Sequence, residues 1–132
     1  MLTERLNMAR QYLDDARYLL AAERFASAVS RAYYAAYQAM WAALEDPPEG
    51  GRWRHLGVIS HFVRGYWFTP AHPHTGPGLL EPLRFPLRRL YQLRIDADYN
   101  LMSLDAASAE ECIETATRTI AEIERRARGE NP

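Results

Sequence analysis

The distribution of glycine and proline divides the chain into two flanks and a middle segment. Seven of the eight prolines lie at positions 47–86, and six of the seven glycines lie at positions 50–78. Both flanks are rich in alanine and other helix formers, and neither contains the alternating β-branched and aromatic residues typical of a strand. The sequence therefore predicts an all-α fold. Its 132 residues suffice for one domain over 1–132, with loop regions near 46–54 and 69–82.

Apolar residues at spacings of three and four predict five helices in this chain. The first helix follows an N-cap at Thr3, and the last opens with a capping box that begins at Ser108. The short helix of the middle segment is expected to turn Leu56, Ile59 and either Phe62 or Val63 inward. Four long helices and one short helix with short connections predict an up-and-down antiparallel bundle. The predicted ranges are 3–20, 25–44, 55–67, 83–100 and 108–128.

The predicted helix over 25–44 has three distinct stripes. The first is large and apolar, and consists of Val29, Tyr33, Ala36, Met40 and Ala43. The second is made only of alanine, which lets a neighbouring backbone approach closely: Ala28, Ala32, Ala35, Ala39 and Ala42. The third is mostly polar or aromatic: Ser27, Arg31, Tyr34, Gln38 and Trp41. We therefore predict that this helix is central and that its polar stripe faces something specific.

Charge and composition exclude several kinds of chemistry. Sixteen basic and seventeen acidic residues give a net charge of -1, so any contact with nucleic acid must be local. All the basic residues are arginine, which excludes Schiff-base chemistry and a Walker-type phosphate lysine. The single cysteine, Cys112, cannot form an intramolecular disulfide. With no apolar run of roughly 20 residues and no signal-peptide pattern, we expect a cytoplasmic protein that does not associate with membranes.

The four histidines lie close together in the sequence, between His55 and His74. A zinc pair on a helix needs a spacing of four residues, whereas His55 and His61 are six apart and point in different directions. His72 and His74 flank a proline in a predicted loop. We therefore expect no metal site and no cofactor.

One arginine interrupts the apolar stripe of the predicted helix over 83–100. Arg94 continues the spacing of the preceding leucines, and Asp98 follows one turn later, where it can pair with the guanidinium. In one interpretation the pair is structural and fixes the helix register. In the other, Arg94 lines a polar cleft in which guanidinium groups bind phosphate and aromatic faces accept bases. Its predicted neighbours in that cleft are Arg31, Tyr34 and Gln38.

Three segments carry a family resemblance: SRAYYAAYQ at 30–38, RHLGVISHF at 54–62 and LYQLRIDADY at 90–99. In this order they resemble the HEPN domain (higher eukaryotes and prokaryotes nucleotide-binding), in the branch with an RAYYA helix and a terminal R-x-x-A-D-Y motif. The resemblance covers about residues 5–125. It implies a five-helix bundle, usually a dimer, that commonly partners a small nucleotidyltransferase in toxin–antitoxin or defence-type pairs. It also implies that many such proteins are metal-independent ribonucleases with an R-x(4–6)-H motif.

The chain departs from that catalytic motif. No histidine follows His74, and the motif positions after Arg94 hold Tyr99, Asn100 and Leu101. Counted from Arg31, the last such position is Gln38, which can bind a phosphate but cannot shuttle a proton near pH 7. Asp98 could replace the histidine only with a raised pKa, whereas a neighbouring arginine lowers the pKa of a carboxyl.

Two functions therefore remain open. The first is a non-catalytic binding module that docks a nucleotidyltransferase, a nucleotide or RNA, and the missing histidine favours it. Its binding residues would be Arg31, Tyr34, Gln38, Arg94, Asp98 and Tyr99. The second is a ribonuclease, with Arg94 and either Asp98 or His55 as catalytic residues.

Two further expectations concern partners. The resemblance implies that some family members receive AMP on a tyrosine near the motif, and Tyr99 is the first tyrosine after Arg94. We also expect a homodimer, because exposed aromatic patches mark interfaces and the chain has more large aromatic residues than a small bundle can hide. The residues behind that expectation are Trp41, Trp53, Tyr66, Trp67 and Phe68.

Overall fold

The computed structural model describes residues 1–65, 80–100 and 102–128. These residues form five α-helices and one 3₁₀ turn, without a strand among them, so the all-α prediction is confirmed. The elements are α1 (Thr3–Ala21), α2 (Phe25–Leu44), α3 (His55–Arg64), η1 (Glu81–Leu83), α4 (Arg84–Asp98) and α5 (Ala106–Ala127). The predicted loop at 70–78 and the predicted helix end at Gly129 lie outside the described residues.

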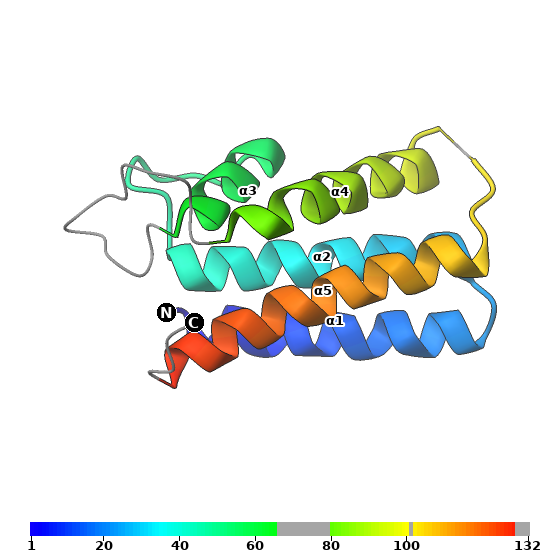
Figure 1. Cartoon of the computed structure of the whole chain (residues 1–132), viewed down its shortest axis with the longest axis horizontal. Coiled ribbons are helices and arrows are strands. Elements are labelled where there is room, and N and C mark those ends of the chain that lie inside the picture. The colour runs from blue at the N-terminus through cyan, green and yellow to red at the C-terminus, as the bar shows by residue number, and fades with distance from the viewer. Residues whose placement is uncertain (66–79, 101, 129–132) are drawn as a thin grey trace.

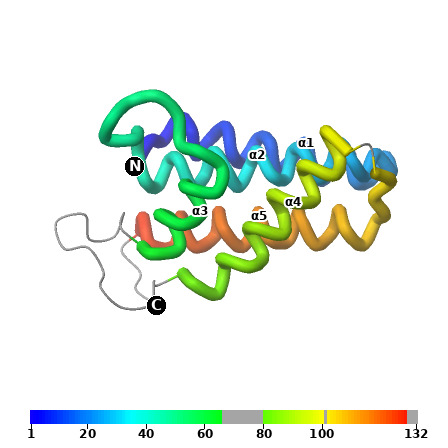
Figure 2. The backbone as a smooth tube through the Cα atoms, turned by 90° about the horizontal axis from the view of Figure 1, so that it is seen from above, coloured from blue at the N-terminus to red at the C-terminus, as the bar shows by residue number. Residues whose placement is uncertain are grey.

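α2 is the central helix and packs against α1, α3, α4 and α5. Figure 1 shows α1, α2 and α5 along the long axis of the molecule with α3 near one end, and Figure 2 shows α4 inclined across this axis. α1 and α2 run in opposite directions, since the N–H of Leu2 donates to the carbonyl of Ala42. α1 and α5 also run in opposite directions (Figure 1). Arg10 of α1 pairs with Glu124, which lies near the C-terminal end of α5.

The burial of α2 follows the three predicted stripes. Twelve of its 20 residues are buried, and all five alanines of the small-residue stripe have no exposed surface. Side chains as small as alanine leave room for neighbouring helices to approach the α2 backbone, and α1 and α5 pack most extensively against it. The prediction that this helix is central is therefore confirmed.

Two predicted helix caps are wrong. Thr3 is the first helical residue of α1, and its N-cap is Leu2, which has no side-chain oxygen. At α5 the N-cap is Asp105, whose carboxylate accepts a hydrogen bond of 2.8 Å from the backbone N–H of Ser108. Ser108 itself lies in the first turn. Aspartate is as good a cap as serine, and Asp105 stands three residues earlier, so the helix begins there.

The short helix α3 differs from its prediction at both a buried position and its end. Leu56 is 47% exposed, whereas Val58 is fully buried beside Ile59, Phe62 and Val63. The inward face of α3 therefore contains Val58 instead of Leu56. The helix ends at Arg64, earlier than predicted, because Gly65 adopts the left-handed conformation (φ 76°) that terminates helices.

Both described tryptophans are hydrogen-bonded to their own chain. Trp41 is 6% exposed, its Nε1 donates to Asp46, and the guanidinium of Arg5 lies 3.6 Å from its ring centroid. Trp53 is half-buried, and its indole N–H donates to the carbonyl of Glu45. Trp41 therefore contributes to no exposed aromatic patch, and the aromatic argument for a homodimer is wrong for this residue. Trp53 keeps part of its surface exposed. The other three residues behind that argument lie outside the described part.

None of the described helices is both long enough and apolar enough to cross a membrane.

Candidate functional site

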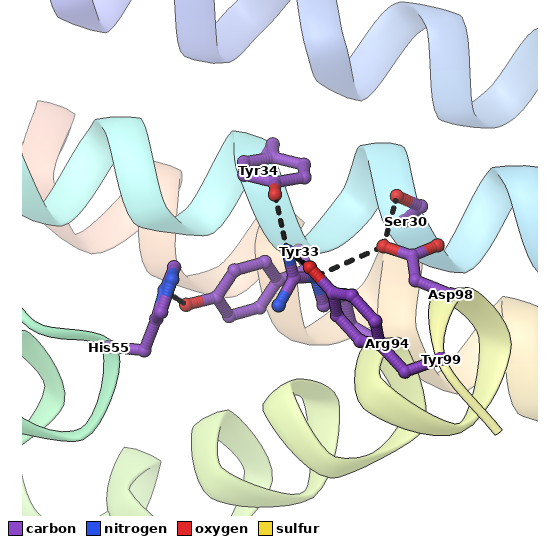
Figure 3. Close-up of polar contacts among 7 residues, drawn as sticks. All are labelled: Ser30, Tyr33, Tyr34, His55, Arg94, Asp98 and Tyr99. Carbon is purple, nitrogen blue, oxygen red and sulfur yellow. Dashed lines mark hydrogen bonds and ion pairs between the residues drawn. The ribbon is translucent and has the colours of Figure 1, made fainter.

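Arg94 is buried in α4, with 5% of its surface exposed. Its Nη2 donates to the hydroxyl of Tyr34 and, at 3.4 Å, to that of Tyr99. Its Nε lies 3.1 Å from Oδ2 of Asp98, close enough for an ion pair but without the direction of a hydrogen bond. Figure 3 shows the guanidinium surrounded by these side chains.

Three tyrosine rings surround this guanidinium. Its central carbon lies 5.4 Å from the ring centroid of Tyr33, 5.2 Å from that of Tyr34 and 5.0 Å from that of Tyr99. Rings at this distance attract a cation. Burial lowers the pKa of Arg94, but the hydroxyl of Tyr34, Tyr99 and the carboxylate of Asp98 outweigh burial and raise it. Arg94 therefore stays charged.

His55 lies on the opposite side of Tyr33 from Arg94 (Figure 3). The Tyr33 hydroxyl and Nδ1 of His55 share a short hydrogen bond, and the imidazole stacks on the ring of Tyr91 at 5.4 Å. Burial raises the pKa of Tyr33, so its phenol stays protonated. The tautomer of His55 decides which of the two groups donates in this hydrogen bond. Burial, followed by the charges of Arg94 and Arg52, lowers the pKa of His55, so its imidazole is neutral near pH 7.

The three predicted catalytic residues thus belong to one cluster, which joins α2, α3 and α4. Each is engaged in it. Nδ1 of His55 is hydrogen-bonded to the Tyr33 hydroxyl. Oδ2 of Asp98 accepts from the hydroxyl of Ser30 at 3.2 Å and lies beside Arg94. Tyr33 contacts both His55, through its hydroxyl, and Arg94, through its ring. Sequence reasoning overlooked this tyrosine, because an aromatic residue on an apolar stripe looks like core.

A groove of about 640 Å³ lies between α1, α2 and α4, and we call it the α1–α2–α4 groove. The guanidinium of Arg31 stands 5.3 Å from the ring centroid of Tyr12, and the rings of Tyr12 and Tyr34 are 6.5 Å apart. Arg31 is exposed and pairs with no carboxylate of the described chain. The lining residues are Tyr12, Leu19, Ala26, Ser27, Ser30, Arg31, Tyr34, Ala97 and Asp98.

Three of the predicted binding residues, Arg31, Tyr34 and Asp98, line this groove. Arg94 does not line it as predicted. It lies behind the wall and contacts two of the wall residues, Tyr34 and Asp98. A buried guanidinium satisfies its charge inside the protein rather than facing the groove.

Gln38 and Tyr99 are outside the groove wall as well. Gln38 is one turn beyond Tyr34 on α2, where its amide oxygen accepts from Nη1 of Arg5 at 2.7 Å. The start of α1 therefore covers the position at which the groove was expected to continue. Tyr99 is 65% exposed at the C-terminal end of α4, where its hydroxyl and its ring contact the guanidinium of Arg94.

Ser27 lines the groove from the polar stripe that the sequence predicted, but Tyr12 and Ser30 were missed as groove residues. Ser30 is one helical turn before Tyr34, so its spacing could have found it. Tyr12 comes from α1, and no spacing within one helix tells which residue of another helix will face it.

No group of three or more His, Cys, Asp or Glu side chains that could hold a metal occurs in the described ranges. His72 and His74 are not within those ranges.

Comparison with known proteins places this arrangement in a family. No curated protein matches the chain. The sequence profile of the HEPN domain matches residues 2–126, nearly the whole chain. The match includes every helix that lines the groove and all but the last residue of α5. The chain therefore belongs to the HEPN domain family.

Proposed function

We propose that this HEPN protein is a nucleotide- or RNA-binding module and that the α1–α2–α4 groove is its binding surface. The observation that carries the proposal is the position of Arg31. This exposed cation has no carboxylate partner in the described chain and is held over an aromatic ring in the groove. A guanidinium binds phosphate with two parallel hydrogen bonds, and aromatic faces accept bases.

The size and lining of the groove suit a ligand of this kind. A volume of about 640 Å³ falls within the range usual for small-molecule sites. Ser27 and Ser30 add hydroxyl groups for polar contacts, while Leu19 and two alanines add apolar surface against which a base can pack. The ring of Tyr12 also limits where the Arg31 guanidinium can go, which lowers the entropy lost on binding.

Arg94 acts in this proposal as a positioning residue. Its positive charge offsets part of the negative charge of Asp98, so that the groove wall repels an incoming phosphate less, and it fixes the hydroxyl of Tyr34. This proposal combines the two interpretations of Arg94 that the sequence left open, a structural ion pair and a part of a binding cleft. The Arg94–Asp98 pair is structural, and the surface that it supports belongs to the binding groove.

We further propose that binding occurs without catalysis, as part of a toxin–antitoxin or defence-type pair with a small nucleotidyltransferase. The protein would act there as a cytoplasmic homodimer. A general base must reach the proton that it removes, and Nδ1 of His55 is already bonded to Tyr33. Asp98 is engaged with Arg94 and Ser30.

One observation favours the second candidate function, a metal-independent ribonuclease. His55 belongs to the same cluster as Arg94, and its lowered pKa leaves a neutral imidazole that can accept a proton. Such an enzyme would use His55 in place of the histidine that is missing after Arg94.

A single RNA experiment separates these functions. A short 5′-fluorescent single-stranded RNA is titrated with purified protein in excess EDTA, and the anisotropy is recorded. The same samples are then run on a denaturing gel. We expect saturable binding of RNA that stays intact. An absence of binding contradicts the proposed module, and cleavage that disappears in His55→Gln establishes the ribonuclease instead.

The partner is tested by coexpression with a small nucleotidyltransferase. We expect the two proteins to copurify. Tyr99 is the tyrosine most open to modification in the Arg94 cluster, since 65% of it is exposed. If AMP is transferred from ATP to its phenol, with release of pyrophosphate, the mass rises by one adenylyl group. The adduct should vanish in Tyr99→Phe and persist in Tyr91→Phe, and an adduct on Tyr33 or Tyr34 would contradict the assignment.

A further inference from the structure

We infer that the α1–α2–α4 groove selects ribonucleotides over deoxyribonucleotides, with the carboxylate of Asp98 as acceptor for the 2′-hydroxyl of the sugar. The inference rests on the proposed function, since it names the class of nucleotide that the same groove takes.

The two oxygens of Asp98 are used unequally. Oδ2 accepts a hydrogen bond of 3.2 Å from the hydroxyl of Ser30 and lies 3.1 Å from Nε of Arg94. Oδ1 accepts no hydrogen bond from any residue that the structure describes. An ionised carboxylate offers about four acceptor sites, so Asp98 keeps unused capacity on one side.

That unused capacity is available to a ligand. Asp98 forms part of the groove wall, and 31% of its side chain is exposed. Ser30 and Arg94 hold the carboxylate from the opposite oxygen, so it need not reorganise when a donor arrives. The site therefore offers a fixed, charged acceptor to a hydroxyl or amine donor.

The charges of the groove specify which donor is expected. Arg31 and Asp98 line the same groove, yet they do not form an ion pair. A ligand that satisfies both must carry an anionic group for Arg31 and a hydrogen-bond donor for Asp98. A ribonucleotide has this combination in its phosphate and its sugar hydroxyls. Within an RNA strand the 2′-hydroxyl is the sugar hydroxyl that remains free, and DNA lacks it.

The test compares uridine 5′-monophosphate with 2′-deoxyuridine 5′-monophosphate by isothermal titration calorimetry. The two nucleotides share the phosphate, the 3′-hydroxyl and the N3–H of uracil, so a difference in their affinities reports the 2′-hydroxyl alone. A hydrogen bond to a charged group predicts that the wild-type protein binds the ribonucleotide roughly tenfold more tightly. Asp98→Asn should bind the two nucleotides about equally, because the amide removes the charge and replaces an acceptor oxygen with a donor.

A control variant isolates the role of Asp98. Asp96 is on the same helix but outside the groove wall, where its Oδ1 accepts from Gln92 and Asn100. Asp96→Asn should therefore keep the wild-type preference.

The outcomes distinguish this inference from the proposed function. Equal binding of both nucleotides by the wild-type protein overturns the inference and leaves the binding module standing. A preference that survives in Asp98→Asn also overturns it. Failure to bind either nucleotide or RNA overturns the proposed function itself. If Asp98→Asn does not fold, the affinities of the wild-type protein for the two nucleotides still test the inference.

Discussion

Arg94 and Asp98 lie one helical turn apart on α4, and their 3.1 Å contact places a buried cation beside a carboxylate of the groove wall. The guanidinium is almost inaccessible to water, whereas 31% of the Asp98 side chain is exposed. The pair therefore connects the core of the bundle to its candidate binding surface.

Removing the cation of this pair should destabilise the fold. Arg94→Gln should lower the free energy of unfolding by about 1–3 kcal/mol, because Tyr34 loses its hydrogen-bond donor and Asp98 its counter-charge. Asp98→Asn should cost less, since water reaches this side chain. Urea denaturation of both variants and of the double variant measures their coupling. Strictly additive costs would contradict an energetic link between the two residues.

His55 should make stability depend on pH. The folded protein lowers the pKa of His55 below its ordinary value of 6.5, whereas the unfolded chain takes up a proton near that value. The resulting stabilisation is fully present above about pH 6.5 and is lost as the pH falls below it. Thermal melts between about pH 7 and pH 5 should show a steeper loss for the wild type than for His55→Gln.

His61 also has a lowered pKa, through burial and then the charge of Arg64, so His55→Gln should retain part of this slope. His61→Gln measures the part of the pH slope that comes from His61. Identical slopes in the wild type and His55→Gln would contradict a lowered pKa of His55 in the folded protein.

The N-cap of α5 should be sensitive at Asp105 and not at Ser108. Asp105→Ala should lower the thermal midpoint, because it removes both the acceptor for the Ser108 N–H and a negative charge at a helix N-terminus. Ser108→Ala should change the midpoint little, since its backbone N–H makes this contact. A larger fall in the thermal midpoint for Ser108→Ala than for Asp105→Ala would support the capping box that the sequence predicted.

The alanine stripe of α2 should tolerate no enlargement. Ala35 has no exposed surface, so Ala35→Leu should cost about 1–3 kcal/mol through overpacking. Gln38→Ala should cost about 1 kcal/mol or less, because it removes one half-buried hydrogen bond from Arg5. Chemical denaturation compares the two, and equal losses would mean that the stripe does not face a tightly packed neighbour.

Helix positions were predictable where one periodic pattern ran without interruption. The bounds of α2 match the prediction because its apolar and alanine stripes run side by side without a break over 28–43. Helix ends were less predictable where two capping residues competed, as Asp105 and Ser108 do at α5. The end of α3 depended on the backbone conformation of Gly65.

The site was predictable only within single helices. The pairing of Arg94 with Asp98 follows from a spacing of four residues on one helix. The contact between Tyr33 and His55 joins α2 to α3, and the covering of Gln38 by Arg5 joins α2 to α1. Such contacts depend on how helices pack against each other, which no periodicity within one segment reports.

The most direct test of the binding groove is the affinity of Arg31→Gln for a fluorescent single-stranded RNA, measured by anisotropy in excess EDTA. Arg88→Gln is the matched control, because Arg88 is exposed on α4 about 15 Å along the helix from Asp98. We predict that Arg31→Gln weakens binding roughly tenfold, as expected for a lost charge-assisted contact, while Arg88→Gln binds like the wild type. Wild-type affinity in Arg31→Gln, or equal losses in both variants, would contradict a nucleotide site in the groove.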